Sequence, residues 1–315
     1  MRVLFADDNH PILIELLTAA GHVCDLHWGL SAAELIKILP AYDALVIRSK
    51  FKITSSILDA AVNLKCIGRV GAGLENIDVA YAQAKGVHCI NVPEGNRDAV
   101  GEHAVGMLLM LLNHLKRADA EVRQGIWRRA ENRGTEISGK CVGIIGYGQM
   151  GSSFAKKISG FGCEIIAYDK YKSAFSDDIV KAVSLEQLLQ KADIISLHVP
   201  LSVETKGMVD AAFLNSCSKS VYVINTARGP CVNTSDLLNA IKSGKVLGAC
   251  LDVLEYESVS FENISAENLP ETFRELIASD RVVLSPHIAG WTHESNYKMS
   301  KLTAERMIAV LAAKS

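Results

Sequence analysis

The chain contains 315 residues, of which 49% are hydrophobic and 22% charged, and its formal net charge is −2. This length predicts two domains, and the near-neutral charge argues against the basic classes that bind nucleic acid or anionic membrane surfaces. No apolar run reaches the roughly 18 residues of a membrane span, and the first ten residues predict a strand and a turn rather than a signal peptide.

The eight cysteines are scattered, with no CxxC pair and no cluster of cysteine and histidine. We therefore expect neither a disulfide nor a metal site. Cysteines within apolar, strand-like runs are expected to be small buried thiols, namely Cys66, Cys89, Cys141 and Cys250. Reduced cysteines predict a cytoplasmic protein.

Short apolar runs alternate with helical patterns along the first 91 residues. Strands are expected at residues 3–6, 22–26, 44–47, 66–69 and 87–91, and helices at residues 11–20, 31–39, 54–61 and 79–85. Pro11 suits the first turn of a helix, and Ser31 with Glu34 has the spacing of a capping box. The alternation predicts a parallel sheet that is covered by helices on both faces.

The longest helical pattern runs from about residue 98 to residue 124. Its small and apolar residues cover more than a narrow stripe, and they include Ala104, Val105, Leu108, Leu109, Leu111 and Leu112. We expect one continuous helix that is buried on several sides, within a core or against a second subunit. Residues 125–139, which include Trp127, are polar and basic and predict an irregular arm.

A second alternating series begins at Cys141. Its strands are expected at residues 141–145, 164–168, 194–198, 221–225, 246–250 and 282–285, and its helices at 152–159, 185–190, 211–216 and 235–243. Residues 258–271 are polar and predict an exposed loop, and a last helix is expected at about 293–312. The series is long enough for a complete doubly wound sheet.

The run GIIGYGQMG links the first two elements of this second series. Its glycines have the GxGxxG spacing and are Gly146, Gly148 and Gly151. The first glycine allows a tight turn, the second lets the backbone approach a pyrophosphate, and the third lets the helix pack on the strand. Backbone N–H groups at the start of the following helix then face the phosphate charge. The pattern predicts a dinucleotide site.

The next strand ends at Asp169, about 20 residues after the glycines. A carboxylate at this place accepts hydrogen bonds from the ribose hydroxyls of the cofactor and repels a 2′-phosphate. The sequence therefore favours NAD over NADP, although the nearby Lys170 and Lys172 weaken the preference.

Polar residues after the other strands are candidates for catalysis, because ligands bind at the carboxyl ends of parallel strands. Arg228, in NTARGP, suits the binding of a substrate carboxylate, and His287, in SPHIAGWT, suits acid–base chemistry. A carboxylate beside His287 would fix the tautomer of its imidazole. Glu255 and Glu257, in LDVLEYE, are both candidates, and the residues alone do not choose between them.

With GYGQMG, YDK, NTARG, an acid after LDV, and SPHIAG in this order, the chain resembles the D-isomer-specific 2-hydroxyacid dehydrogenases. The resemblance implies an α/β fold of two doubly wound parallel-sheet (Rossmann-like) domains with a cleft between them. Residues 1–97 with 290–315 would form a discontinuous substrate (catalytic) domain, and residues 98–289 the NAD-binding Rossmann domain. The implied catalytic set is Arg228, Glu257 and His287, because the family spacing from LDV favours Glu257.

The resemblance also implies contacts to both ligands. Those to NAD are expected from Gly146, Tyr147, Gly148, Gln149, Met150, Gly151, Asp169, His198, Val199, Pro200, Thr205, Thr226, Ala227, Arg228, Asp252, His287 and Gly290. Those to the substrate are expected from Arg48, Arg69, Val70, Gly71, Ala72, Gly73, Asn96 and Trp291. A homodimer is implied as well, with the long helix and the arm near Trp127 at the subunit contact.

Within the family, GRVGAGLENID and NVPEGNRDAVGEH resemble the D-3-phosphoglycerate dehydrogenases, which serve serine biosynthesis. Arg48 and Arg69 would then bind the substrate phosphate. Trp291 departs from the small residues usual after the catalytic histidine in that group. The chain ends soon after its last helix, so we expect no appended regulatory domain and no feedback control by serine through one.

Two alternatives remain at this point. One is a glyoxylate or hydroxypyruvate reductase, which would use the same catalytic set on an unphosphorylated acid. The other is a binding protein similar to the NADH-sensing transcriptional corepressors, which share this fold and cofactor. The presence of Arg228, Glu257 and His287 favours an enzyme.

Overall fold

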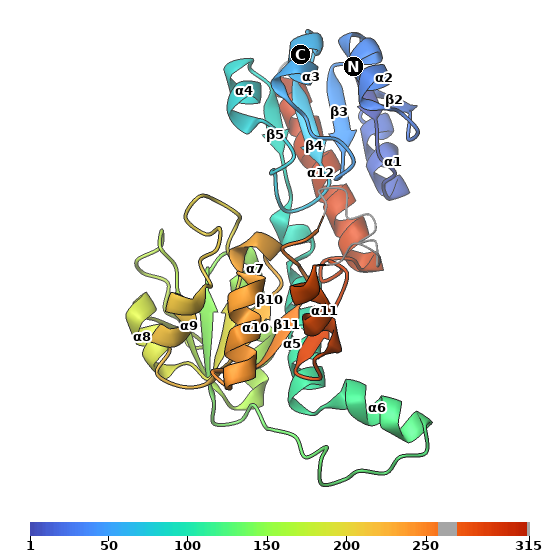
Figure 1. The fold of residues 1–315 in the computed structure, drawn as a ribbon. Coiled ribbons are helices and arrows are strands. Elements are labelled where there is room, and N and C mark those ends of the chain that lie inside the picture. Colours follow the sequence, from blue (N-terminus) through green and yellow to red (C-terminus); the bar gives the residue numbers. More distant parts are fainter. Residues whose placement is uncertain (258–269, 314–315) are drawn as a thin grey trace. The chain divides into compact units, whose positions relative to one another are not determined.

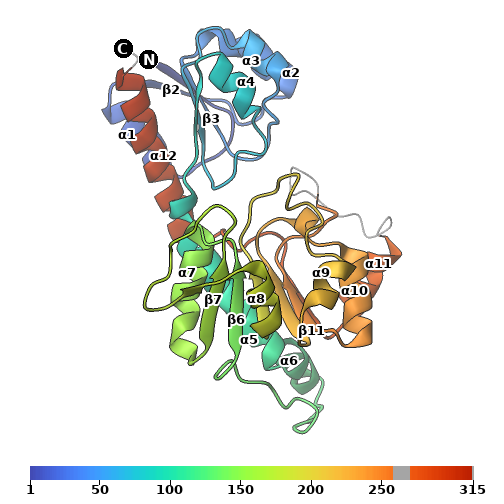
Figure 2. The same cartoon turned by 90° about the vertical axis from the view of Figure 1, so that its left-hand side faces the viewer.

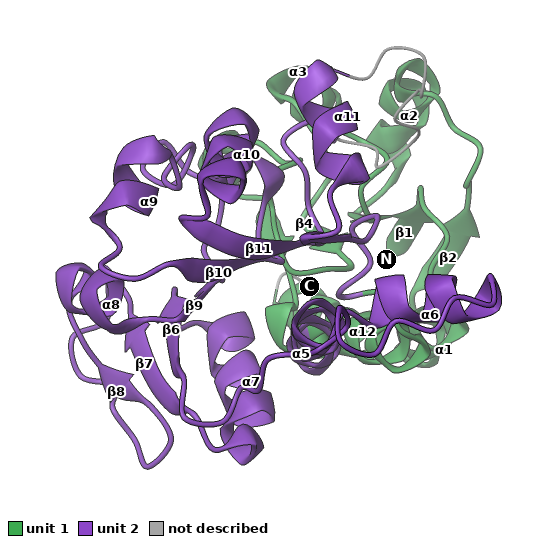
Figure 3. Ribbon diagram, turned by 60° about the horizontal axis from the view of Figure 1, so that its bottom comes forward, with its two compact units in different colours: residues 1–96, 291–315 green, residues 97–290 purple. Residues whose placement is uncertain are grey.

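Each of the two apolar series folds into its own parallel sheet, in two compact units shown in different colours in Figure 3. The structure, a computed structural model, describes residues 1–257 and 270–313. Met1–Asn96 and Trp291–Ser315 form unit 1, and Arg97–Gly290 forms unit 2. The expected α/β class with two parallel sheets is confirmed.

Unit 1 contains a five-stranded parallel sheet in the order β2-β1-β3-β4-β5 (Figure 1). The strands are β1 (Arg2–Phe5), β2 (Val23–Leu26), β3 (Ala44–Ile47), β4 (Cys66–Arg69) and β5 (His88–Ile90). Alternate residues of β1 face opposite sides: Leu4 joins one core cluster and Val3 and Phe5 the other. Both faces are therefore covered, as the near-continuous apolar runs predict.

The helices of unit 1 divide between the two faces (Figure 2). On one face lie α2 (Ala32–Ile38), α3 (Ser55–Ala60) and α4 (Val79–Ala84), and on the other α1 (Pro11–Ala19) and α12 (His293–Ala313). The capping box of Ser31 and Glu34 is confirmed at the start of α2. The last helix thus completes the core of the first sheet, since Met299 and Met307 of α12 pack in it.

Unit 2 contains a seven-stranded parallel sheet in the order β12-β11-β10-β9-β6-β7-β8. The strands are β6 (Cys141–Ile145), β7 (Glu164–Tyr168), β8 (Lys181–Ala182), β9 (Ile194–Leu197), β10 (Val221–Asn225), β11 (Val246–Leu251) and β12 (Val282–Leu284). The direction in which strands are added reverses beside β6, where the chain turns from β7 back to β9. Such a switch point is where doubly wound sheets bind ligands.

Helices cover both faces of this sheet as well (Figure 3). On one face lie α5 (Arg97–Leu112) and α7 (Gln149–Ile158), and on the other α8 (Leu185–Lys191), α9 (Ala211–Ser216), α10 (Thr234–Ser243) and α11 (Glu271–Ala278). Helices α5 and α7 approach closely because Gly101 has no side chain: a Cβ atom there would lie 2.9 Å from the hydroxyl of Ser153.

The expected continuous helix at residues 98–124 is wrong. The chain forms α5 and then a separate helix α6 (Leu115–Arg123), and His114 between them has a left-handed backbone with φ of 51°. Asn113 and His114 are among the residues that leave a helix most readily, because both tolerate this conformation. Helix α5 is buried on several sides, whereas α6 has no buried residue.

Three further elements differ from the expectation. Helix α7 begins at Gln149 rather than at residue 152, and the short edge strand β8 and helix α11 were not predicted. The polar stretch before α11 hid its amphipathic pattern, in which Phe273 and Leu276 are buried. Most of the loop expected at 258–271 lies outside the described residues.

None of the helices in the described part of the chain is both long and apolar enough to cross a membrane. No disulfide joins any of the eight cysteines, all of which lie in the described residues. Burial raises the pKa of Cys141 to about 11 and raises that of Cys250 as well, so both stay protonated near neutral pH. Residues 1–257 and 270–313 contain no group of three or more histidines, cysteines or carboxylates arranged to hold a metal ion.

Candidate functional site

The glycine-rich turn between β6 and α7 is held by close backbone contacts. Gly146 has φ of 91°, and a Cβ atom added there would lie 2.6 Å from the carbonyl oxygen of His198. A Cβ atom at Gly151 would lie 2.1 Å from the carbonyl oxygen of Gly146. A Cβ atom at Gly148, in contrast, would meet no described atom within 4 Å. The first and third glycines thus build the turn, and the second leaves its outer surface open.

That open surface suits the pyrophosphate of a dinucleotide. Gly148 is the residue before α7, and no described side chain caps this end of the helix. Its first backbone N–H groups therefore point outward from the turn and, with the helix dipole, favour an anion. The half-buried Met150 and the exposed Gln149 lie in the first turn of α7.

Asp169, directly after β7, fixes the glycine-rich turn from the neighbouring strand. Its Oδ2 accepts a hydrogen bond from the backbone N–H of Tyr147 (2.8 Å), and its Oδ1 accepts one from that of Tyr171 (3.0 Å). The ring of Tyr147 is buried and stacks on Phe175, with 4.9 Å between ring centroids. The carboxylate is thereby held at the carboxyl end of β7.

The two lysines near Asp169 have other partners. The ammonium group of Lys170 lies 2.6 Å from Oε1 of Glu204, and that of Lys172 donates to the carbonyl oxygen of Tyr147 at 2.6 Å. Neither contact is with the Asp169 carboxylate. The Asp169 carboxylate is therefore held in place without either lysine. Its negative charge would repel a 2′-phosphate, which supports NAD.

Two buried polar atoms lie at the carboxyl ends of β9 and β10. Nε2 of His198 is bonded to the hydroxyl of Ser196 at 2.8 Å, while its Nδ1 has no hydrogen-bond partner among the described residues. The hydroxyl of Thr226 likewise finds no partner in the described part of the chain. Because unpaired buried polar groups are costly, these atoms fit a site that a polar ligand completes. A dinucleotide is therefore compatible with the residues present.

The histidine itself is neutral. His198 is 8% exposed, and its burial lowers the pKa to about 3. An uncharged imidazole brings no positive charge to a phosphate, and the expected contact of His198 with the cofactor stays a prediction.

The turn after His198 is built by its own side chains. The hydroxyl of Thr205 donates to the carbonyl oxygen of Pro200 at 2.6 Å and accepts from the backbone N–H of Ser202 at 2.8 Å. Val199 packs against the core of the sheet. Direct contacts of these residues with the cofactor stay a prediction.

The loops after β11 and β12 bring Glu257 and His287 together. Oε2 of Glu257 lies 2.8 Å from Nδ1 of His287, and both side chains are mostly buried. The other carboxylate oxygen of Glu257 accepts from the backbone N–H of Leu254. Glu255 points elsewhere, because its carboxylate accepts from the backbone N–H and hydroxyl of Thr234 at the start of α10, at 3.1 and 2.9 Å. The structure thus separates two acids that the residues alone did not.

Asp252 anchors the loop that carries the imidazole. Its carboxylate is 1% exposed and accepts from the backbone N–H groups of Ile288 and Ala289, each at 2.8 Å, and from the hydroxyl of Ser285 at 2.6 Å. Its carbonyl oxygen accepts from the N–H of His287 at 2.7 Å. Its carboxylate thus holds the loop that ends at Gly290. The expected contact of Asp252 with the cofactor stays a prediction.

The backbone of His287 is in the left-handed region, with φ of 55°. For a residue with a side chain this conformation costs about 1–3 kcal/mol and persists only when its surroundings enforce it. The four hydrogen bonds to Asp252 enforce it here. Strain at this single residue directs the imidazole toward Glu257.

Arg228 lies in a loop that Asn225 organises at the end of β10. The fully buried Asn225 donates to the carbonyl oxygen of Arg228 at 3.0 Å and accepts from the N–H of Ala227 at 3.1 Å. Nη1 of Arg228 donates to the carbonyl oxygen of Ala227 at 2.7 Å. A Cβ atom on the next residue, Gly229, would lie 1.9 Å from the carbonyl oxygen of Leu254. The missing side chain therefore brings the arginine loop against the glutamate loop.

The expected substrate residues lie in unit 1. The guanidinium of Arg48, after β3, lies 4.2 Å from the centre of the Trp291 ring, a cation–π contact. The backbone N–H of Arg48 donates to the carboxylate of Asp7 at 2.6 Å. Burial lowers the pKa of Arg48, while the charges of Asp7 and Asp8 act in the opposite direction.

Side-chain contacts also hold the loop after β4. The side chain of Arg69 lies directly over Gly71, because a Cβ atom there would overlap the guanidinium. The carbonyl oxygen of Ala72 accepts from the side chain of Asn91 at 2.5 Å. Val70 is 3% exposed, so its side chain belongs to the core.

The remaining two expected residues of unit 1 differ in their burial. Gly73 is half-buried, and Oδ1 of Asn96 is buried without a hydrogen-bond partner among the described residues. Contact of either with a substrate stays a prediction.

Several residues that shape these sites do not belong to the set predicted from the sequence. Arg97, at the start of α5, donates to the side chain of Gln149 at 2.7 Å, beside the glycine-rich turn. Gly229 and Ser285 were not singled out either, although they lie within the motifs NTARGP and SPHIAGWT. A sequence criterion that also selects small residues within two positions of a catalytic candidate would have found Gly229 and Ser285.

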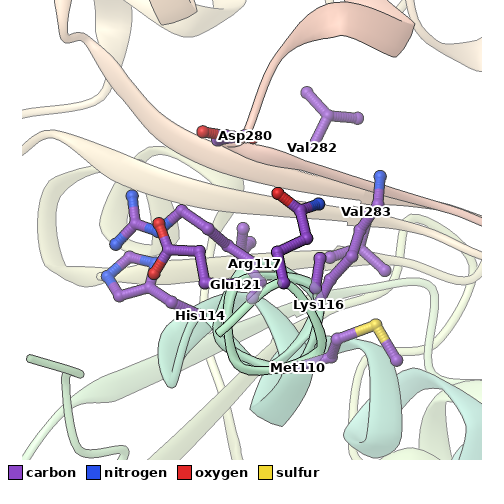
Figure 4. A pocket seen from close by; sticks show the side chains of 11 residues that line it. Met110, His114, Lys116, Arg117, Glu121, Asp280, Val282 and Val283 are labelled. Carbon is purple, nitrogen blue, oxygen red and sulfur yellow. The ribbon is translucent and has the colours of Figure 1, made fainter. Parts of the chain in front are cut away.

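A separate hollow of about 170 Å³ lies between α5, α6 and β12 (Figure 4). Met110, His114, Arg117 and Glu121 line it together with Val283. It contains none of the residues that were expected to bind a ligand.

Comparison with known proteins identifies the family to which these features correspond. Residues 105–289 match the NAD binding domain of the D-isomer specific 2-hydroxyacid dehydrogenases. The structure is similar to that of D-2-hydroxyisocaproate dehydrogenase, with a TM-score of 0.87, 25% identity and coverage of 100% of this chain and 98% of the other.

Two curated relatives are similar over most of this chain. A D-3-phosphoglycerate dehydrogenase of Archaeoglobus fulgidus is 35% identical over 98% of this chain and 57% of its own length. A hydroxypyruvate reductase of Thermotoga maritima is 37% identical over 88% of both chains. The chain thus spans little more than half the length of the phosphoglycerate dehydrogenases that it matches.

The neutral, buried His198 predicts a specific loss of stability in acid. Its folded pKa of about 3 lies below the unfolded value of 6.5, so the unfolded chain binds the proton first. This contribution is intact above pH 6.5 and is lost as the pH falls toward 3. Between pH 7 and 5 the wild type should lose about 2 kcal/mol more unfolding free energy than His198→Gln.

Urea unfolding of both proteins at the two pH values measures this difference. The comparison cancels the acid sensitivity that the variant shares with the wild type. Equal losses in both proteins would show that His198 is charged in the folded state.

Proposed function

The chain belongs to the D-isomer specific 2-hydroxyacid dehydrogenase family, and on that premise we propose that it transfers a hydride between NAD and a D-2-hydroxy acid. The observation that carries the proposal is the 2.8 Å contact of Glu257 with His287 in the unit that contains the glycine-rich turn. A carboxylate–imidazole pair beside a dinucleotide site is what proton transfer coupled to hydride transfer requires.

His287 exchanges the proton. Because Nδ1 contacts the Glu257 carboxylate, which accepts hydrogen bonds only, Nδ1 carries a hydrogen. The neutral ring then presents Nε2 as the base for a substrate hydroxyl, and the charged ring returns the proton to a developing alkoxide. Glu257 holds the ring in this tautomer and stabilises its positive charge.

Arg228 binds the substrate carboxylate. Its guanidinium presents paired N–H donors that match a carboxylate, and its charge polarises the neighbouring carbonyl group. The loop bonds from Asn225 keep the residue in place before the substrate arrives. When bound, NAD supplies the hydride acceptor.

For the substrate we propose 3-phosphoglycerate, which would be oxidised to 3-phosphohydroxypyruvate. Two arginines support a phosphate-bearing acid, since Arg48 follows β3 and Arg69 is the last residue of β4, both at the carboxyl edge of the sheet of unit 1. The relatives that are D-3-phosphoglycerate dehydrogenases agree with this choice.

One observation favours a second candidate, the reduction of hydroxypyruvate or glyoxylate. The guanidinium of Arg48 is covered by Trp291, and Asp7 and Asp8 place negative charge near it. A phosphate dianion would meet these carboxylates, whereas a small unphosphorylated acid would not need the space that Trp291 fills.

We also propose that the chain forms a homodimer through α6 and the arm that follows it. Large apolar side chains are exposed there: Trp127 is 77%, Val122 52% and Leu115 51% exposed. The arm is tied to α6 by Asn132, whose side chain binds both Arg117 and Glu121. A second copy of the chain would cover these side chains.

A panel of 2-oxo acids tests the activity and the substrate. Oxidation of NADH is followed with 3-phosphohydroxypyruvate, hydroxypyruvate, glyoxylate and pyruvate. We expect the highest kcat/KM with the phosphorylated acid. Turnover of unphosphorylated acids alone would transfer the assignment to the second candidate, and NADH binding without any turnover would favour a corepressor-like binding protein.

Substitutions in the catalytic pair test the mechanism. His287→Asn should lower kcat by about 10²- to 10⁴-fold with NADH binding retained, because asparagine tolerates the left-handed backbone but transfers no proton. Glu257→Gln should lower kcat by roughly 10- to 100-fold. Steady-state kinetics and titration of NADH fluorescence measure both quantities.

Glu255→Gln is the matched control, because Glu255 is two residues away but binds Thr234. It should turn over like the wild type. Equal losses in the two glutamate variants would contradict the assignment of Glu257.

Variants on α6 test the dimer. We expect the wild type to sediment with twice the chain mass of 34.1 kDa. Val122→Asp places a charge in the proposed contact and should shift the protein toward the monomer. Val203→Asp is the matched control, since Val203 is 98% exposed elsewhere in unit 2. A monomeric wild type would refute the dimer.

A further inference from the structure

His103 reaches the loop of the catalytic histidine from a distant helix. It lies in the second turn of α5, and its Nε2 is 2.9 Å from the hydroxyl oxygen of Ser285, 182 residues later in the chain. The same nitrogen lies 3.5 Å from Oδ1 of Asp252. Ser285 is two residues before His287, so α5 touches the base of the catalytic loop.

The direction of these hydrogen bonds follows from the donors and acceptors. The carboxylate of Asp252 only accepts, so the hydroxyl of Ser285 donates its hydrogen to Asp252 across 2.6 Å. The oxygen of Ser285 therefore accepts from His103, and Nε2 of His103 carries a hydrogen. The three side chains form a chain of donors that ends on Asp252.

The carboxylate of Asp252 requires hydrogen-bond donors such as the Ser285 hydroxyl because it is buried. Its carboxylate is 1% exposed, and it already holds the backbone N–H groups of Ile288 and Ala289. A buried carboxylate is stable only when its oxygens are bonded and its charge is balanced. The imidazole of His103 is 24% exposed and donates to the Ser285 hydroxyl, which in turn donates to Asp252.

From this arrangement we propose that His103 is a positioning residue for the proposed reaction. It acts through Ser285 and Asp252 to hold the loop 285–289, and with it the left-handed backbone of His287. The role rests on the proposed function, because that function assigns the proton transfer to His287. The hydrogen bond and ion pair of His103 go to Ser285 and Asp252 and not to Arg228, Glu257 or His287, so His103 is not a catalytic residue.

Two substitutions of His103 separate positioning from packing. His103→Leu keeps the volume and the helix propensity but removes the donor, and His103→Gln keeps a donor N–H at a similar reach. We expect kcat to fall roughly 10- to 100-fold in the leucine variant, with the KM of the 2-oxo acid and the Kd of NADH close to wild type. The glutamine variant should recover most of the lost turnover.

A double-mutant cycle with Ser285→Ala tests the connection. If His103 acts through Ser285, the variant with both His103→Leu and Ser285→Ala should lose no more kcat than the worse single variant. Losses that multiply would show that the two residues act independently, which overturns the proposal. It is overturned equally if folded His103→Leu keeps wild-type kcat or if His103→Gln is as impaired as His103→Leu.

A spectroscopic measurement keeps this proposal apart from the proposed function. In protein labelled with ¹⁵N-histidine, the ring signals of His287 are assigned by their loss in His287→Asn. We expect these signals to shift or broaden in His103→Leu and to stay as in the wild type in His103→Gln. If the wild type turns over no acid, the proposed function fails, and the signals alone decide: unchanged signals in His103→Leu overturn the positioning role.

Discussion

The buried carboxylate of Asp252 is the constraint on which the candidate site depends. It stands directly after β11 and is excluded from water, so its oxygens must be satisfied by neighbouring donors. The donors come from the loop after β12, through two backbone N–H groups and the hydroxyl of Ser285. Because this loop has to close around the carboxylate, His287 takes a left-handed backbone and its imidazole meets Glu257.

The parallel sheet supplies the second requirement, which is proximity. Strands β10, β11 and β12 are parallel neighbours, so the loops that follow them leave the same edge of the sheet. Close approach of two of these loops is possible because Gly229 has no side chain in the way of Leu254. On the other side of β9, Gly146 and Gly151 serve the same purpose for the dinucleotide turn.

The charges around Arg48 in unit 1 bear on which substrate the chain would bind. Arg48 is partly buried beneath Trp291, and the nearby Asp7 accepts a hydrogen bond from its backbone. A guanidinium in such surroundings is held in one orientation but is partly neutralised. The charges around Arg48 therefore set whether it binds a phosphate or only a carboxylate. A sequence motif that places an arginine after β3 carries no information on those charges.

Local patterns in the sequence were sufficient to predict the alternating elements, the two parallel sheets and the dinucleotide turn. These depend on local rules, because apolar runs, capping residues and glycine spacing act over a few residues. The prediction failed where a local preference competed with the pattern: the left-handed His114 ended α5, and the polar residues before α11 hid that helix. Family spacing favoured Glu257 over Glu255, but only the tertiary structure shows that Glu257 contacts His287 while Glu255 binds Thr234, and only it brings His103 to Ser285. Hydrogen bonds between residues far apart in the chain exist only after the sheet has set its loops side by side.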